Sequence, residues 1–223
     1  MNLILGLDQI GDDDAPQVGG KAVALASLHR AGLSVPSTLC LTTEAYELFV
    51  QRASLRAVIH QELGRKRFHD LRWEELWDVA LRISNRFLRA PVPEEVVLAI
   101  EPYLAAAGPE RALAVRSSAP GEDSSTTSFA GLHDSFVGVR GKESTLEAIQ
   151  QVWASLWTDR ALLYRRELGI EVDSSAMAVV IQELVEGEVS GVVFGVHPND
   201  PGLMAVEAVY GLNQGLVDGT IEP

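Results

Sequence analysis

The hydrophobic positions in the first half of the chain follow the spacing of amphipathic helices. A helix is predicted to begin near Gly20 and to end at Gly32, where a glycine can close the last turn. Further helices are predicted from residue 42 onward, over 73–89 and over 93–106, with a short strand over 38–41 and an extended lead-in over 1–17. Residues 1–108 are therefore expected to form a mainly helical N-terminal subdomain.

The pattern changes after Gly108, where short apolar runs replace the helical spacing. Strands are predicted over 111–117, 135–139, 178–181, 192–194 and 204–206, the last two joined by a turn at 198–202. One long amphipathic helix is predicted from about Glu143 to Glu167. The expected fold class is α+β, in which residues 109–223 form a mostly antiparallel sheet with packed helices.

Composition and charge narrow the class of protein. The 223 residues are 47% hydrophobic and 22% charged, as in ordinary globular proteins. With 18 basic and 31 acidic side chains the net charge is −13, which disfavours binding to nucleic acid or to an anionic membrane. Cys40 is the only cysteine, so an intramolecular disulfide is excluded. The sequence has neither a basic leader nor an apolar run of about 18 residues, so we expect a cytoplasmic protein.

The first candidate for chemistry is Gly19-Gly20-Lys21 at the expected helix start. Glycines let a backbone approach a ligand closely, helix N-terminal amides attract anions, and a lysine adds positive charge, so the segment suits a polyphosphate. It is not the P-loop pattern, because Ala15 and Ala22 stand where that pattern needs Gly and Ser or Thr. A loop glycine pair beside a solvated lysine is the competing interpretation, and the triplet alone favours it.

The second candidate is Arg116, at the end of a predicted strand and before a loop over 118–131 that is rich in Ser, Thr and Gly. A guanidinium fork matches phosphate oxygens, and the amides and hydroxyls of such a loop can close over a phosphate. An ion pair beside a surface loop explains the same residues equally well. His133, which follows the loop, is expected to be structural or solvated.

Two further predicted strands lead into polar residues. The run over 178–181 continues into Gln182 and Glu183, where backbone groups can pair with the edge of an adenine and a carboxylate can accept from ribose hydroxyls. Glu207 offers a hard oxygen ligand of the kind that Mg²⁺ prefers. Ordinary strand ends explain both patterns, and one carboxylate does not make a metal site.

These candidates belong to a series of motifs that covers nearly the whole chain in a fixed order. The series reads Val18-Gly19-Gly20-Lys21, Val115-Arg116-Ser117-Ser118-Ala119, Ser128-Phe129-Ala130-Gly131, Trp153-Ala154-Ser155-Leu156-Trp157 with Asp159-Arg160-Ala161 and Tyr164-Arg165-Arg166, Gln182-Glu183, Val189-Ser190-Gly191, and Glu207-Ala208-Val209-Tyr210-Gly211-Leu212. In this order it resembles the nucleotide-binding portion of the phosphoenolpyruvate synthase and pyruvate phosphate dikinase family. That portion has an ATP-grasp-type fold and is shared with the rifampicin phosphotransferases.

The resemblance implies ATP and Mg²⁺ as cofactors and assigns roles to the candidate residues. Lys21 and Arg116 would bind the ATP phosphates as the catalytic pair. The remaining cofactor-binding residues would be Gly19, Gly20, Ser117, Ser128, Gly131, Gln182, Glu183, Leu184 and Val185, and Glu207 would be a metal ligand. In this family ATP passes a phosphoryl group to a histidine on a separate domain, a reaction that depends on positioning and charge neutralisation.

The chain ends at Pro223, within a motif of the family, so the resemblance implies a nucleotide-binding region that is incomplete at its C-terminus. The phosphohistidine and acceptor-binding domains would be partners outside this chain, and full turnover is not expected of the chain alone. Two other interpretations stay open: a non-catalytic nucleotide-binding or protein-interaction module without the metal site, and a structural fragment without a ligand. The acceptor, whether pyruvate, a rifampicin-like antibiotic or a glucan, is not specified.

Overall fold

The structure is a computed structural model of residues 1–223. It describes all of them except 1, 122, 125–126, 129–131, 171, 173–174, 198–199, 218 and 222–223, and it describes 123–124 and 127–128 by their backbone alone. The chain divides into two compact units, Met1–Leu184 and Val185–Pro223, which we describe separately. The boundary expected at residue 108 falls inside the first unit.

The first unit is built around a five-stranded antiparallel sheet of order β1-β2-β7-β3-β6. Its strands are β1 (Ile4–Gly6), β2 (Thr38–Leu41), β3 (Leu113–Ser118), β6 (Ser135–Val139) and β7 (Ala178–Glu183), and the short pair β4 (Asp123–Ser124) and β5 (Thr127–Ser128) stands apart from them. Because β1 and β2 pair beside β7, the N-terminal half and the later strands share one sheet, and the compact unit continues past residue 108.

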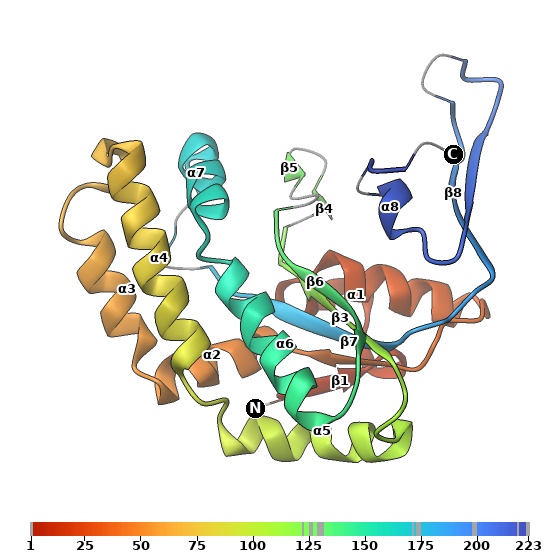
Figure 1. The fold of residues 1–223 in the computed structure, drawn as a ribbon, viewed down its shortest axis with the longest axis horizontal. Coiled ribbons are helices and arrows are strands. Elements are labelled where there is room, and N and C mark those ends of the chain that lie inside the picture. The colour runs from red at the N-terminus through yellow and green to blue at the C-terminus, as the bar shows by residue number, and fades with distance from the viewer. Residues whose placement is uncertain are drawn as a thin grey trace. The chain divides into compact units, whose positions relative to one another are not determined.

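Helices cover both faces of this sheet (Figure 1). They are α1 (Ala15–Arg30), α2 (Thr43–Arg52), α3 (Leu55–Leu63), α4 (Trp73–Arg89), α5 (Glu94–Ala107), α6 (Lys142–Ser155) and α7 (Asp159–Leu168), with short 3₁₀ turns η1 (Leu7–Gln9), η2 (Asp12–Asp14) and η3 (Phe68–Asp70). In Figure 1, α6 crosses in front of the sheet and α1 lies behind it. Each face therefore has its own apolar core.

The core on the α6 side is the larger one and contains a cluster of aromatic rings. Phe49 stacks on Trp153 with ring centroids 4.9 Å apart, and the indole Nε1 of Trp157 donates to the hydroxyl of Tyr46 at 3.0 Å. Burial raises the pKa of Tyr46. The core on the α1 side is formed by small residues of that helix against the sheet, namely Val18, Ala22 and Ala26 against Cys40, Ala178 and Val180.

Several predicted elements are confirmed with the predicted bounds, including the helix over 73–89 and the strands over 38–41 and 135–139. The single helix predicted from Glu143 to Glu167 is wrong, because α6 ends at Ser155 and α7 begins at Asp159. Thr158 separates them with an extended backbone and an Oγ1 that accepts from the amide of Ala161 at 3.3 Å, which is the geometry of a helix N-cap. The lead-in expected to be extended over 1–17 instead contains β1, two 3₁₀ turns and the start of α1.

The second unit is a hairpin of β8 (Val189–Phe194) and β9 (Ala205–Tyr210), followed by the short helix α8 (Gln214–Val217). The strands predicted over 192–194 and 204–206 fall in this hairpin, and residues 198–199 of the predicted turn lie outside the described residues. Several large apolar side chains of this unit are exposed, among them Val193, Val206 and Tyr210. None of the helices in the described parts of the chain is long and apolar enough to cross a membrane.

Candidate functional site

The helix that carries Lys21 is interrupted at Gly19. This residue has φ 75° and ψ 168°, a combination that is essentially reserved for glycine. One turn precedes the break, and the long regular run of α1 begins at Gly20, close to the predicted helix start. Lys21 therefore lies in the first turn of that run, where its side chain is half-buried.

Gly19 makes a very close approach to the end of β3. A Cβ placed on Gly19 would lie 2.2 Å from the carbonyl oxygen of Ser118 and 2.4 Å from its carbonyl carbon, so only glycine fits here. The approach brings the Lys21 segment and the Arg116 strand together, although they are about a hundred residues apart in the sequence. The two candidate phosphate-binding segments therefore meet in the structure.

Arg116 lies on the α1 side of the sheet. In β3, side chains alternate between the two faces, so Arg116 shares its face with Ser118, whose hydroxyl contacts α1. Its partner on β7 is Val180, which packs in the α1-side core with Val18. We call the α1 side of the sheet, together with the Lys21 segment that packs on the end of β3, the Lys21–Arg116 face.

Gln182 shares this face at the far end of β7. It pairs with Ala114. Along the strand it lies two residues, or about 7 Å, from the level of Arg116. It lies four residues, or about 13 Å, from the level of Ser118. Its amide Nε2 donates to the hydroxyl of Thr38 at 2.9 Å. The strand end predicted to bind adenine and ribose thus lies on the same face of the sheet as Arg116 and Ser118, further along β7.

Glu183 differs from Gln182 because the next side chain of a strand points to the opposite face. Its carboxylate Oε1 lies 3.8 Å from the Nε of Arg111, and its charge helps to raise the pKa of Tyr103 on α5, after the larger effect of burial. The amide of Leu184 donates to the carbonyl of Ala112 at 2.9 Å, which extends the sheet by one residue. Val185 begins the second unit and is 63% exposed.

The other residues predicted to bind phosphate are Ser117, Ser128 and Gly131, and they do not share one location. The side chain of Ser117 is buried on the face opposite to that of Arg116, because it is one residue removed in the strand. The backbone of Ser128 pairs with Asp123 in the β4–β5 ribbon. The side chain of Ser128 and the whole of Gly131 lie outside the described residues.

Three cations act electrostatically on His133, which follows the expected loop in the sequence. His133 is 9% exposed and its pKa is lowered to about 4, first by burial and then by the positive charges of Arg165, Lys21 and Arg160. His133 is therefore buried and neutral at pH 7, whereas the sequence had left a structural and a solvated histidine both open.

Arg165 is the most deeply buried of these cations, at 2% exposure. Its Nη1 donates to the hydroxyl of Ser175 at 3.0 Å, its Nε donates to the carbonyl of Ala161 at 3.1 Å, and its guanidinium lies 5.5 Å from the ring centre of Trp157. Burial lowers its pKa to about 10, so it remains charged. The only earlier signal for it was its place beside Tyr164 in the motif series.

The predicted metal ligand Glu207 lies in β9 of the second unit, opposite Val192 and half-buried. Among the residues whose side chains are described, no three metal-ligating groups come together. A site built from protein ligands alone is therefore not found in the described parts of the chain.

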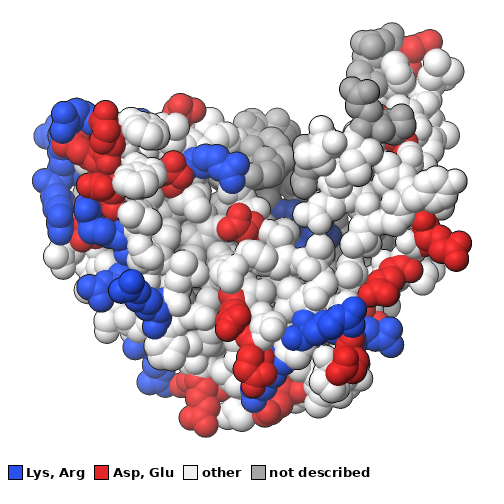
Figure 2. Space-filling view, viewed as in Figure 1, with Lys and Arg blue, Asp and Glu red and all other residues white. Residues whose placement is uncertain are grey.

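Several basic side chains elsewhere on the described surface are engaged in ion pairs. On the face shown in Figure 2, Lys and Arg gather over the α3–α4 side, mixed with Asp and Glu. Lys66 pairs with Glu75 at 3.0 Å, and the Nε of Arg82 pairs at 2.8 Å with Glu62, a carboxylate that is itself buried. This basic area is therefore a network of ion pairs around α3 and α4.

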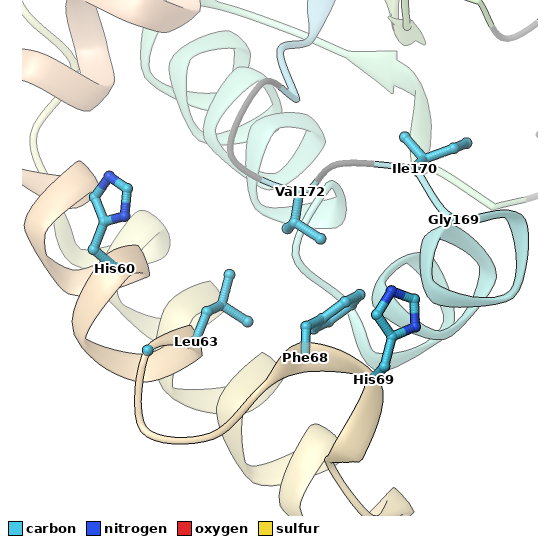
Figure 3. Close-up of a pocket in the computed structure, with 8 residues that line it drawn as sticks. His60, Leu63, Phe68, His69, Gly169, Ile170 and Val172 are labelled. Atoms are coloured by element: carbon cyan, nitrogen blue, oxygen red, sulfur yellow. The ribbon is translucent and has the colours of Figure 1, made fainter.

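A cavity of about 400 Å³ lies between the end of α3, η3 and the end of α7. Figure 3 shows the apolar side chains of Leu63, Phe68 and Val172 converging on it, with His60 and His69 at its margin. None of its lining residues belongs to the Lys21–Arg116 face, so it is a separate feature of the surface.

Comparison with known proteins shows which family this sequence belongs to. The family model for the pyruvate phosphate dikinase AMP/ATP-binding domain matches residues 15–223. The chain is 37% identical over 228 aligned positions to a phosphoenolpyruvate synthase of Aeropyrum pernix, covering 99% of this chain and 28% of that protein. It is 38% and 32% identical to rifampicin phosphotransferases of Streptomyces sviceus and Bacillus subtilis, covering 99% of this chain and 26% of each relative.

The chain thus spans about a quarter of the length of these curated relatives. The resemblance seen in the motif series is confirmed along almost the whole sequence. The chain belongs to the family of the pyruvate phosphate dikinase AMP/ATP-binding domain.

Proposed function

We propose that this chain binds ATP on the Lys21–Arg116 face and serves a phosphotransferase of the phosphoenolpyruvate synthase and pyruvate phosphate dikinase type. The observation that carries the proposal is the close approach of Gly19 to Ser118, which sets the Lys21 segment beside the strand that bears Arg116. Two cations from separate elements then face one polyphosphate. Family membership supports an adenine nucleotide as the ligand.

Each residue contributes to phosphate binding in its own way. Lys21 supplies a compact positive charge from the first helical turn, and Arg116 supplies a planar fork that matches two phosphate oxygens. Gly19 and Gly20 let the backbone come close to the ligand. Ser128 and Gly131 belong to the loop that we assign to cover it, and Ser117, whose side chain lies on the opposite face of β3, is assigned to the phosphates only through its backbone. In a chain of net charge −13, such local cations are what an anionic ligand requires.

The adenine and ribose are assigned to the far end of β7. Gln182 presents its amide on the same face as Arg116, about 7 Å further along the strand. Because the side chain of Glu183 turns to the other face, we assign its contribution, with those of Leu184 and Val185, to backbone groups at the end of the strand other than the amides of Glu183 and Leu184, which already donate to Ser37 and Ala112. A nucleotide lying along the sheet would span the distance between these groups and Lys21.

Mg²⁺ fits this scheme as a companion of ATP rather than as a resident of a protein cage. Magnesium in such sites is usually held by one or two carboxylates together with the phosphates of the substrate. Glu207 offers one such carboxylate, and no cluster of three protein ligands occurs among the described side chains. The metal, when bound with ATP, would neutralise phosphate charge.

The wider reaction depends on parts of a longer protein. We propose that the phosphoryl group passes from ATP to a histidine on a separate domain, and that an acceptor-binding domain completes the transfer. The role of this chain is to hold and neutralise the phosphates, which is the main requirement of phosphoryl transfer. We also propose that its α+β architecture is of the ATP-grasp type.

Titration calorimetry with ATP and Mg²⁺ tests the proposed site. Lys21→Ala and Arg116→Ala should each weaken binding at least tenfold, because a charge-assisted hydrogen bond contributes about 1.5–3 kcal/mol. Lys142→Ala is the matched control, since it removes an exposed cation that pairs with Glu101 at 2.8 Å away from this face. Unchanged affinity in both site variants, or an equal loss in the control, would overturn the assignment.

A further inference from the structure

The hydroxyl of Ser118 is buried between two backbone groups of the Lys21 segment. Its Oγ donates to the carbonyl of Val18 at 2.7 Å and accepts from the amide of Ala22 at 3.3 Å. Ser118 has no exposed surface. The last side chain of β3 thus links the residue before the Gly19 break to the first turn of the helix after it.

This arrangement is a helix N-cap in which the capping oxygen comes from a different element. In the helical run that begins at Gly20, Gly19 stands at the N-cap position and Ala22 is the third helical residue. An N-cap side chain normally accepts a hydrogen bond from the second or third amide of its helix. Gly19 has no side chain and no room for one, because its Cβ would lie 2.2 Å from Ser118. Ser118 supplies the missing cap from β3.

The cap matters because the turn that it holds is intrinsically weak. Two consecutive glycines precede Lys21, and glycine is the residue that loses most conformational freedom when a helix forms. Without the hydroxyl, the amide of Ala22 and the carbonyl of Val18 would lose a buried partner. The backbone of Lys21, directly before Ala22, would then be held less firmly.

We propose that Ser118 is the positioning residue of this site: its hydroxyl caps the Lys21 helix from the neighbouring strand and so fixes Lys21 relative to Arg116. The inference rests on the proposed function, and it assigns Ser118 no contact with the nucleotide. Arg116 lies two residues earlier on the same face of β3, so one strand carries both the arginine and the cap. Ser117, on the opposite face, cannot supply this bond.

A double-mutant cycle on the full chain tests the inference, with the dissociation constant of ATP and Mg²⁺ as the readout. Ser118→Ala should weaken binding about tenfold, the effect of losing one helix cap. In a Lys21→Ala background the same substitution should change binding by less than about twofold, because there is no lysine left to position. The thiol of Ser118→Cys is a weaker acceptor, so the affinity of this variant should lie between those of the wild-type chain and Ser118→Ala.

Ser155→Ala is the matched control. Its hydroxyl is equally buried and makes a bond of the same length, 2.7 Å, to the carbonyl of Val152 in its own helix. It should keep the wild-type affinity for ATP, whatever the change in its stability. Binding is compared below the lowest unfolding midpoint of the set.

The outcomes separate the inference from the function on which it rests. If Lys21→Ala weakens binding while Ser118→Ala does not, or if the two losses simply multiply, the positioning role is overturned and the proposed function stands. An affinity loss in Ser155→Ala equal to that in Ser118→Ala would also overturn it. If the wild-type chain does not bind ATP, or Lys21→Ala binds normally, the proposed function fails and the inference falls with it.

Discussion

Replacing Gly19 by alanine tests the close approach that organises the candidate site. The backbone of Gly19, with φ 75° and ψ 168°, costs a residue with a side chain about 1–3 kcal/mol. The new methyl group would lie 2.2 Å from the carbonyl oxygen of Ser118 and 2.4 Å from its carbonyl carbon. These are backbone atoms that cannot rotate away, so overpacking adds about 1–3 kcal/mol. We expect Gly19→Ala to cost about 4 kcal/mol in all, or about 10 °C in the unfolding midpoint.

Gly32→Ala is the control for a positive-φ glycine that lacks the contact. Gly32 also has a positive φ, of 79°, but a Cβ there meets no atom within 4 Å. It should therefore lose only about 1 kcal/mol, or about 3 °C. Heating followed by circular dichroism and by the fluorescence of the buried tryptophans measures both variants. Equal losses in the two would refute the claim that the Lys21 segment is packed directly against β3.

Three more substitutions probe the surroundings of the site. Tyr46→Phe leaves the buried indole N–H of Trp157 without its acceptor and should lower the free energy of unfolding by about 1–3 kcal/mol in urea titrations; no loss would mean that this bond does not hold the aromatic core. Because the pKa of His133 is lowered to about 4 in the fold, the unfolded chain binds more protons, so stability should fall by about 2 kcal/mol between pH 7 and pH 5. That loss should disappear in His133→Asn. A His133→Asn variant that keeps the wild-type pH dependence of stability would contradict the role given to His133. Thr158→Ala removes the cap on the amide of Ala161 and should cost about 1 kcal/mol, with faster hydrogen exchange confined to the start of α7; an unaltered exchange rate there would argue against the cap.

Local patterns predicted those parts of the fold that local physics determines. The helix over 73–89 and the strands over 38–41 and 135–139 have the predicted bounds, because side-chain periodicity and flanking turn residues specify them. The break between α6 and α7 also had a local signal, in Thr158 followed by Asp159 at a helix start, but the continuous apolar spacing outweighed it.

The rest depended on contacts between distant parts of the chain. Ser117 was predicted to bind phosphate, and its side chain lies on the face of β3 opposite to that of Ser118, which meets the Lys21 segment. Which of two adjacent strand residues faces α1 follows from the pairing of β3 with β7, and the local sequence does not encode it. The approach of Arg160 and Arg165 to His133 is likewise a product of tertiary packing. The extent of the first unit follows from β1 and β2 pairing beside β7.

The thermal unfolding midpoint of the chain, with and without millimolar ATP and Mg²⁺, tests the central claim most directly. A ligand at a hundred times its dissociation constant stabilises a protein by about 2.7 kcal/mol, which for a chain of this size is about 5–10 °C. We predict a rise of that order in the wild-type chain and its loss in both Lys21→Ala and Arg116→Ala. An unshifted wild-type midpoint, or a shift that both variants retain, would contradict the account.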